Sequence, residues 1–320
     1  MRATAQAQPN IALIKYWGKR DVTRNLPAVG SISITLADLY TTMSVDFERG
    51  VRADRLVVNG VENSAMLARV TRCLDAVAGA DRGRAEIMSN SNFPIAAGLA
   101  SSASSFAALV VAAAAASQKD HTRAQLASLA GRASGSAARS LLGGFVELQN
   151  TEQDIAVSNL CSGDDWPLQV VVAITASGPK AVGSTEAMEL SRTTSPFYER
   201  WVEQQQADLD EARAAIAEKD FARLASVAEH NCLKMHSVMW GSRPPMVYWN
   251  SATLACMEAI RDMQSAGVAT FFTIDAGPQL KAVCEPAEVE KVRDVLASVP
   301  GVEDVLVTGL GAGARLVDDG

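Results

Sequence analysis

The segment from residue 93 to 116, FPIAAGLASSASSFAALVVAAAAA, constrains the fold more than any other part of this 320-residue chain. A turn rich in glycine and serine runs directly into an Ala-rich stretch, and a helix that is apolar on all sides must be buried. Ser101 and Ser102 therefore stand at the mouth of a buried helix. The first N–H groups of a helix lack helical partners and its dipole is positive there, which favours phosphate binding. The alternative is that these serines only cap a core helix.

The composition narrows the possible partners. Lys and Arg number 29 and Asp and Glu 36, so the formal net charge is −7, and no basic stripe with interleaved aromatic residues is visible. We therefore expect no nucleic-acid partner. The apolar run 106–116 is too short to span a bilayer, and Met1–Gln8 contains no apolar run typical of a signal peptide, so no membrane partner is expected. The five cysteines are scattered and lack CxxC spacing, which favours a reducing cytoplasm.

Hydrophobic periodicity predicts an α+β protein. Strands are expected at 31–35, 41–47, 84–88, 145–149, 168–175, 271–274, 280–284 and 302–307, with a hairpin at 56–61 that turns at Asn59-Gly60. Helices are expected at 65–78, after the serine turn, and at 122–133, 196–218, 221–237, 251–266 and 289–298, with Thr122 as a cap. A cluster of Ser, Gly, Pro and Lys at 176–184 predicts a boundary between domains 1–183 and 184–320.

Three cations follow an apolar strand near the start of the chain. The segment 9–21, PNIALIKYWGKRD, alternates up to Lys15, so the strand is expected to deliver Lys15 inward before it turns at Gly18. A strand so apolar seldom ends in Lys15, Lys19 and Arg20 unless these cations meet an anion. The alternative is a solvated basic edge, because lysine is common on edge strands.

An arginine lies among very small residues in the segment 131–145, GRASGSAARSLLGGF. Small neighbours such as Ser134 and Ser136 let the backbone approach a ligand, and Arg139 offers a bidentate fork to a carboxylate or phosphate. The alternative is a close helix packing that requires Gly and Ala.

An acidic residue ends a core strand in the segment 271–283, FFTIDAGPQLKAV. Asp275 in that position is a candidate general base, and the alternative is an Asp that only forms the turn. The segment 309–313, GLGAG, is similar to a nucleotide loop, but no helix is expected after it. His121, His230 and His236 have no other potential metal ligands at suitable spacing in the sequence, so no metal site is expected from them.

Five segments together resemble the diphosphomevalonate decarboxylases of the GHMP kinase superfamily: NIALIKYWGKRD, NFPIAAGLASSAS, SGSAARSLLGGFVE, SPFYERW and TIDAGP, in that order. The resemblance extends from Asn10 to about Cys284, and its combination of motifs is specific, because the kinase members share only the Gly-Ser turn and the general fold. It implies a ribosomal-protein-like N-terminal α/β domain and a ferredoxin-like C-terminal α+β domain. It also implies a cleft between them and usually a homodimer.

The resemblance implies a reaction that consumes ATP. The 3-hydroxyl of (R)-5-diphosphomevalonate would be phosphorylated, and phosphate would then leave together with CO₂ to give isopentenyl diphosphate. The partner is thus a small phosphorylated molecule. Mg²⁺ would be held mainly by ATP, with Ser101 or Ser102 as the candidate protein ligands.

Site residues follow from the matching motif positions. Asp275 would orient or deprotonate the hydroxyl, Lys15 would lie close to it, and Arg139 would hold the substrate carboxylate. Substrate binding is implied for Tyr16, Trp17, Gly18, Lys19, Arg69, Ser134, Gly135, Ser136, Ser184 and Thr185, and ATP binding for Asn10, Gly98, Leu99, Ala100, Ser101 and Ser102.

The chain departs from the family pattern at two places. It has Val29-Gly30-Ser31 where the family usually reads Asn-Ser-Ser, and Ser184-Thr185 where many bacterial members carry Ser-Arg, whose arginine contacts the diphosphate. Eukaryotic members have Ser-Thr there. The alternatives therefore include a decarboxylase that acts on the 5-monophosphate and a kinase that stops at the 3-phosphate. A binding or regulatory protein that has lost the chemistry is the third alternative.

Overall fold

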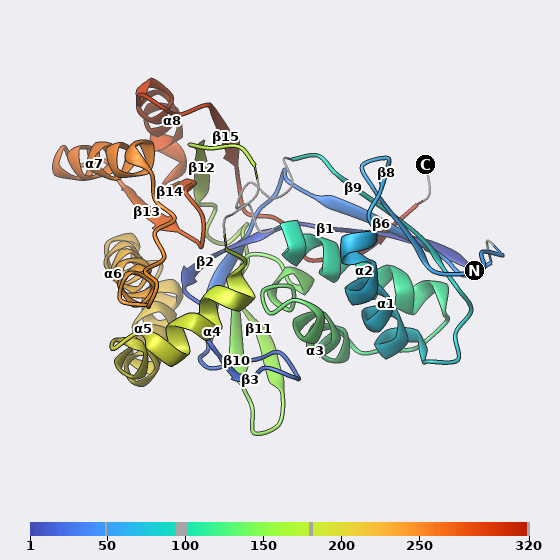
Figure 1. Cartoon of the computed structure of the whole chain (residues 1–320). Helices are drawn as coiled ribbons and strands as arrows, with labels where there is room; N and C mark the ends of the chain where they lie inside the picture. Colours follow the sequence, from blue (N-terminus) through green and yellow to red (C-terminus); the bar gives the residue numbers. More distant parts are fainter. Residues whose placement is uncertain (49, 94–100, 179–181, 319–320) are drawn as a thin grey trace.

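The computed structural model describes residues 1–48, 50–93, 101–178 and 182–318. Figure 1 shows two groups of elements side by side. In one group, helices α1, α2 and α3 lie along a long sheet that contains β1, β6 and β9. In the other, helices α5 to α8 surround a second sheet that contains β12, β13 and β14. The α+β class expected from the sequence is confirmed.

The largest sheet has six strands in the order β16-β1-β6-β9-β7-β8. In chain order these are β1 (Arg2–Ala7), β6 (Thr41–Asp46), β7 (Arg55–Val58), β8 (Val61–Glu62), β9 (Glu86–Ser91) and β16 (Arg315–Val317). The predicted hairpin is confirmed, because β7 and β8 pair antiparallel around Asn59 and Gly60, both of which have positive φ angles. The strand β16 returns from the end of the chain to pair with β1, with Thr4 opposite Val317.

Two helices are packed against this sheet, α1 (Ser64–Ala78) and α2 (Ser101–Ala116), and a third helix, α3 (Arg123–Ala133), packs against these two. In α2 every side chain from Phe106 to Ala114 is buried, as expected for a helix that is apolar on all sides. The predicted cap of α3 is confirmed, because the Thr122 side chain accepts from the Gln125 backbone and the Gln125 side chain accepts in return.

A four-stranded sheet, β11-β10-β5-β2, contains the start of the motif NIALIKYWGKRD. Its strands are β2 (Asn10–Ile14), β5 (Ser31–Thr35), β10 (Phe145–Asn150) and β11 (Ile155–Cys161), and the small hairpin β3 (Lys19–Asp21) and β4 (Leu26–Pro27) follows β2. A 3₁₀ helix at Arg139–Leu141 precedes β10. Every residue of β2 and β5 is buried, which indicates a sheet covered on both faces.

The third sheet is antiparallel, with the order β13-β14-β12-β15. Its strands are β12 (Gln169–Ile174), β13 (Thr270–Ile274), β14 (Leu280–Cys284) and β15 (Asp304–Thr308). The helices are α4 (Ser184–Thr194), α5 (Tyr198–Glu218), α6 (Phe221–Trp240), α7 (Ser251–Ser265) and α8 (Val289–Ser298), with a 3₁₀ helix at Pro286–Glu288. Side chains of the two faces alternate: Phe271 and Val283 pack with α5 and α6, whereas Phe272 and Ala282 pack with α7 and α8.

Several elements were not predicted from the sequence: the helix α4 and the strands β1, β3, β4, β11 and β16. The helix α4 starts inside the Ser- and Gly-rich cluster that reads as a linker. The strand β12 pairs with β14 and β15 although it precedes the boundary expected after residue 183, and that boundary stays a prediction.

The glycines of segment 309–313 serve packing. The Gly311 amide donates to the Thr35 carbonyl at 2.7 Å, and a Cβ at Gly313 would lie 2.2 Å from the Leu141 carbonyl oxygen. Within the described ranges, no helix is both long and apolar enough to cross a membrane.

Candidate active site

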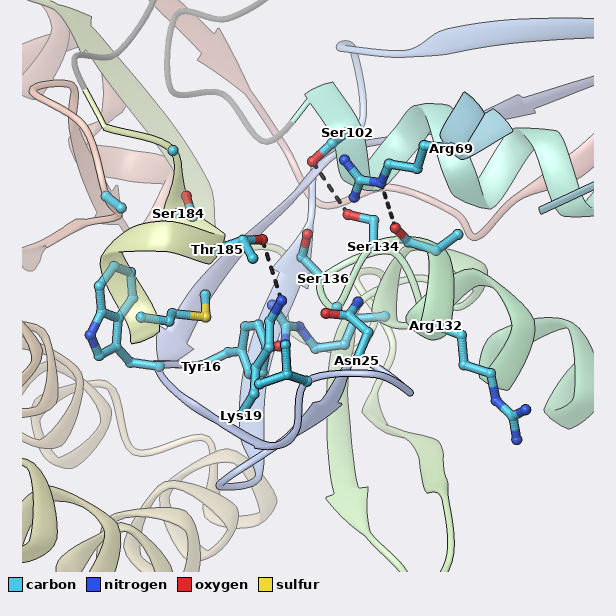
Figure 2. Close-up of a pocket in the computed structure, with 18 of the residues that line it drawn as sticks. Tyr16, Lys19, Asn25, Arg69, Ser102, Arg132, Ser134, Ser136, Ser184 and Thr185 are labelled. Carbon is cyan, nitrogen blue, oxygen red and sulfur yellow. Dashed lines mark hydrogen bonds between the residues drawn. The ribbon is translucent and has the colours of Figure 1, made fainter. Parts of the chain in front are cut away.

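A cavity of about 770 Å³ gathers residues from β2 and the segment after it, α1, α3, α4 and the turn after β13 (Figure 2). Its described lining contains one acidic side chain, Asp275, and six basic ones, Lys15, Lys19, Arg69, Arg72, Arg132 and Arg139. The chain as a whole carries a formal charge of −7, so this local excess of cations is the opposite of the average. Such a field attracts an anionic ligand.

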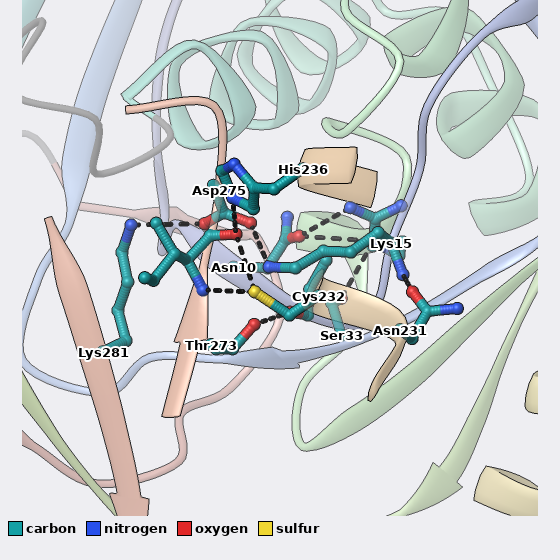
Figure 3. A network of polar contacts seen from close by, with 12 residues as sticks. Asn10, Lys15, Ser33, Asn231, Cys232, His236, Thr273, Asp275 and Lys281 are labelled. Atoms are coloured by element: carbon teal, nitrogen blue, oxygen red, sulfur yellow. Dashed lines mark hydrogen bonds and ion pairs between the residues drawn. The ribbon is translucent and has the colours of Figure 1, made fainter. Parts of the chain in front are cut away.

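Asp275 lies between two buried ammonium groups (Figure 3). The Lys15 Nζ donates to Oδ1 at 2.7 Å, and the Lys281 Nζ lies 3.4 Å from Oδ2. Both lysine side chains are 1% exposed, whereas Asp275 is 27% exposed and lines the cavity. The prediction that β2 delivers Lys15 inward is confirmed, and the solvated-edge alternative is wrong for this residue.

The backbone in front of Asp275 is fixed from two sides (Figure 3). The Ile274 amide donates to the Cys232 Sγ at 3.2 Å, and the His236 Nε2 lies 3.2 Å from the Ile274 carbonyl oxygen, so α6 holds the end of β13. The Thr273 hydroxyl donates to the carbonyl of Ala12 at 3.0 Å, which joins β13 to the strand that carries Lys15. The acid and the lysine therefore share one rigid frame. Burial lowers the pKa of His236 to about 3, so this imidazole is neutral near pH 7.

Arg139 is 2% exposed and is held by a polar cradle. Its Nη2 donates to the Asn10 Oδ1 at 3.2 Å, its Nη1 to the Ser31 Oγ at 2.5 Å and its Nε to the Ser33 Oγ at 2.9 Å. The Asn10 amide in turn donates to the Ser140 Oγ at 2.8 Å. Burial lowers the pKa of Arg139 to about 10, so the guanidinium keeps its charge near neutral pH. Asn10 contacts this arginine, and its implied role in ATP binding stays a prediction.

The opposite part of the cavity joins Lys19 to the start of α4 (Figure 2). The Lys19 Nζ donates to the Thr185 Oγ1 at 3.3 Å, and the Arg69 Nε donates to the carbonyl of Ala133 at 2.7 Å. Burial, followed by the charge of Arg69, lowers the pKa of Lys19 below its ordinary value. An anion between these two cations would relieve both effects.

A buried hydroxyl faces the same space. The Tyr16 Oη has no hydrogen-bond partner among the described residues, and burial raises the pKa of Tyr16 to about 12, so it stays protonated. A Cβ at Gly135 would lie 2.6 Å from this oxygen, so glycine is required for the close approach. An unsatisfied donor in a cation-lined cavity fits an anionic ligand, because a buried polar group without a partner is costly.

The serines at the start of α2 divide into two pairs. The hydroxyls of Ser104 and Ser105 donate to the Ser101 carbonyl at 3.1 and 2.8 Å and so serve the helix itself. Ser102 lines the cavity, 3.4 Å from the Ser134 Oγ (Figure 2). The predicted residues Gly98, Leu99 and Ala100 lie outside the described residues.

Most of the other predicted site residues come together in the cavity: Trp17, Ser136 and Ser184 also line it, whereas Gly18 and Ser101 are not among its described lining. Trp17 is buried and donates from Nε1 to the Ser191 Oγ at 3.1 Å, which fixes it against α4. Gly18 has a φ of +99°, and a Cβ there would collide with the Tyr198 ring.

Sequence reasoning missed several residues. Arg72, Arg132 and Asn25 line the cavity, although the Arg132 side chain points away from the other labelled residues in Figure 2 and forms an ion pair with Asp154 at 2.8 Å. Ser31 and Ser33 hold Arg139. A signal for this serine pair was present, because the alternation SISIT places polar side chains on one face of a strand that is buried throughout. Lys281 gave no such signal.

We expect the double change Ser101→Ala and Ser102→Ala to raise the KM for ATP about tenfold or more, because hydrogen bonds to charged groups are among the stronger ones. Steady-state kinetics with ATP as the varied substrate measure the effect. Ser105→Ala is the matched control, since its hydroxyl serves the Ser101 carbonyl, and its ATP kinetics should be normal. A double variant that only melts earlier would assign these serines to capping alone.

Two family models match the chain. Residues 7–159 match the diphosphomevalonate decarboxylase-like N-terminal domain, and residues 170–309 match the mevalonate 5-diphosphate decarboxylase C-terminal domain. Diphosphomevalonate decarboxylase of Candida albicans is 31% identical over 98% of this chain and 97% of its own length. Phosphomevalonate decarboxylase of Haloferax volcanii is 31% identical over 100% and 98%, respectively.

Solved structures agree with this relationship. The mevalonate diphosphate decarboxylase from Staphylococcus aureus has a TM-score of 0.93 at 36% identity and covers 99% of this chain and 98% of its own. MDDEF in complex with MVAPP, AMPPCP and magnesium has a TM-score of 0.92 at 33% identity and covers 100% and 99%. The fold and the cation-lined cavity thus define an enzyme of the GHMP kinase type. Within that class, the chain belongs to the diphosphomevalonate decarboxylase family.

Proposed function

We propose that the protein catalyses the ATP-dependent decarboxylation of (R)-5-diphosphomevalonate to isopentenyl diphosphate, with ADP, phosphate and CO₂ as the other products. The observation that carries this proposal is Asp275, an acid held by two buried ammonium groups and open to a cavity whose other charged lining residues are basic. Phosphoryl transfer depends on positioning and charge neutralisation more than on covalent chemistry. The described site provides both.

In the first step the 3-hydroxyl attacks the γ-phosphorus of ATP. The proton of this tertiary alcohol passes to Asp275, which lies at the cavity wall, and the bond from phosphorus to the ADP oxygen breaks. Lys15, 2.7 Å from the acid, neutralises charge on the transferring phosphoryl group. Arg139 holds the substrate carboxylate, so that one clamp sets the position of the hydroxyl beside Asp275.

In the second step the bond between C3 and its phosphorylated oxygen breaks, and the electron pair leaves with phosphate. The electron pair of the bond between the carboxylate carbon and C2 then forms the C2–C3 double bond, and CO₂ is released. The buried cations favour this step because they stabilise the departing phosphate.

The nucleotide end of the site is proposed at the start of α2, where Ser102 lines the cavity. Backbone N–H groups at a helix start and a serine hydroxyl fit a phosphate group. In the described ranges, no group of three or more His, Cys, Asp or Glu side chains could hold a metal ion. Mg²⁺ would therefore be held mainly by the phosphate oxygens of ATP and would neutralise their charge, with Ser101 or Ser102 as the candidate protein ligands. MDDEF with AMPPCP and magnesium supports this assignment.

The 5-diphosphate is proposed to lie among Tyr16, Lys19, Arg69 and Thr185. A 5-monophosphate is the second candidate substrate. It is favoured by the full-length similarity to phosphomevalonate decarboxylase of Haloferax volcanii and by Thr185, a neutral residue at the start of α4. Lys19, Arg69 and Arg72, the lining cations that remain besides Lys15, Arg139 and the ion-paired Arg132, favour the more highly charged diphosphate.

One assay separates the candidates. ADP, phosphate and CO₂ are measured with mevalonate, 5-phosphomevalonate and 5-diphosphomevalonate, each with ATP and Mg²⁺. We expect all three products in equal amounts from the diphosphate. Turnover with the monophosphate alone would establish the second candidate, whereas ADP without CO₂ would identify a kinase that stops at the 3-phosphate. No ADP from any of the three would indicate a binding protein.

We further propose that the enzyme acts in the cytoplasm as a homodimer. The five cysteines are all unpaired, which supports a reducing compartment. The dimer rests on the family resemblance, and sedimentation at micromolar concentration tests it: a mass near that of one 33.8 kDa chain would exclude it.

A further inference from the structure

We propose that Lys281 is a positioning residue for the reaction: its ammonium group holds the Oδ2 of Asp275, so that the carboxylate keeps the orientation in which it receives the substrate proton. This inference rests on the proposed function. It assigns a role to a residue that lies in the segment 271–283 but was not among the predicted site residues, and that does not line the cavity among the described residues.

The placement of Lys281 is unusual for a lysine. It lies on β14, an interior strand between β12 and β13, opposite Val172 on one side and Thr273 on the other. Alternation along the strand puts its side chain on the same face as Val283, which packs in the apolar core with α5 and α6. The side chain is 1% exposed. A charge in such a place is costly unless an opposite charge compensates it.

Asp275 supplies that compensation. The Lys281 Nζ lies 3.4 Å from Oδ2 and approaches from the side opposite to Lys15 (Figure 3). This separation is longer than a charge-assisted hydrogen bond, so the ammonium acts through its charge. Burial lowers the pKa of Lys281, and the carboxylate counteracts this effect by raising it.

Two cations, one at each carboxylate oxygen, can fix the orientation of the Asp275 side chain, whereas one cation cannot. The terminal torsion of an aspartate is broad, so the contact of Oδ1 with Lys15 does not by itself fix the rotation of the carboxylate about its last bond. A second charge at Oδ2 selects one orientation. Asp275 is the only one of these three residues with appreciable exposure, at 27%, so the two lysines hold the carboxylate from two sides while it stays open to the cavity. A base must lie within hydrogen-bond reach of the proton that it abstracts.

The first test uses Lys281→Met, which keeps the length of the side chain and removes the charge. We expect kcat to fall roughly tenfold to a hundredfold, the usual consequence of misplacing a catalytic group, while the Kd for the phosphorylated mevalonate stays within about threefold. The matched control is Val172→Ala, on the neighbouring strand directly opposite Lys281. This control loses packing on the same sheet face, and should melt earlier with normal kcat. A Lys281→Met protein with wild-type kcat overturns the proposal.

The second test asks whether an added cation can replace the missing ammonium group of Lys281 and rescue turnover. Lys281→Ala leaves a cavity that ethylammonium fits, so this cation should restore turnover in a saturable manner, whereas Lys281→Met leaves no room and should not respond. If Lys281→Met does not fold, Lys281→Ala with ethylammonium decides the matter. Folded Lys281→Ala protein that stays inactive at saturating ethylammonium contradicts the proposed role.

The third test separates action through Asp275 from an independent effect. In an Asp275→Asn background, Lys281→Met should change the residual kcat less than about twofold, because the group that it positions is absent. Fully multiplicative losses would mean that Lys281 acts on something else. The wild-type protein serves in every assay: if it releases no CO₂ from any phosphorylated mevalonate, the proposed function fails, whereas the Lys281 proposal fails only when the wild-type protein is active.

Discussion

Asp275→Asn is expected to lower turnover about a hundredfold or more while substrate binding stays nearly intact. The amide keeps the shape of the side chain but cannot accept the proton of the 3-hydroxyl. A hundredfold loss corresponds to about 2.7 kcal/mol of activation free energy. Pre-steady-state measurement of ADP formation at saturating ATP reports the phosphoryl-transfer step directly, and isothermal titration reports substrate affinity.

The same change leaves Lys15 and Lys281 facing a neutral group, so some loss of stability is expected as well. Asp54→Asn is the matched control. Asp54 forms a buried ion pair with Arg82 at 2.6 Å and does not line the cavity among the described residues, so this variant should lose stability and keep its turnover. An Asp275→Asn protein that retains more than about a tenth of wild-type turnover would remove this residue from the mechanism.

Arg139→Lys is expected to lower turnover roughly a hundredfold, and Arg139→Met at least as much. A lysine has one compact ammonium group in place of the planar fork, so it cannot bind the substrate carboxylate and the cradle of Asn10, Ser31 and Ser33 at the same time. The loss should affect ADP and CO₂ formation alike, because one clamp positions the substrate for both steps. Product quantification under single-turnover conditions measures the two together.

A purely structural role for Arg139 makes a different prediction. Lysine and methionine are similar in length, so both variants would then melt earlier and keep the catalytic rate of the wild-type protein. Turnover and melting temperature are therefore compared for the two variants side by side. Wild-type catalysis by the Arg139→Met protein would eliminate the carboxylate clamp and leave Arg139 as a hub that joins β2, β5 and the segment before β10.

Sequence patterns predicted the helices and strands whose apolar residues recur regularly because one face, or the whole element, is buried. The helix α2 follows the serine turn as expected, and the buried strands β5, β12, β13 and β14 appear within about one residue of their expected bounds, because their apolar pattern follows directly from burial. The strand β16 is only three residues long and is specified by its partner β1, which lies far away in sequence. The helix α4 begins in a composition that is typical of loops, and its packing against α5 outweighs that local preference.

The site was predictable where small residues, cations and an acid stand together in short motifs. Lys15, the ion-pair partner of Asp275, is 260 residues away in the chain. Only the resemblance to the family, which has the same motifs in the same order, suggested that the two residues meet. Lys281 had no such context. It stands inside an apolar strand, where a lysine is usually read as an edge residue, and only the tertiary structure reveals the charge that it faces.

The pairing of β1 with β16 affects the protein while it is being made. The strand β1 leaves the ribosome well before β16, so throughout synthesis one side of β1 presents unpaired N–H and C=O groups. Open strand edges are templates for pairing with other chains, and nascent intermediates that expose them aggregate. Residues 315–317 therefore cover the open edge of β1 only after most of the chain has been synthesised. A chain that stops before these residues would keep this edge of β1 open, and a chaperone would have to shield it.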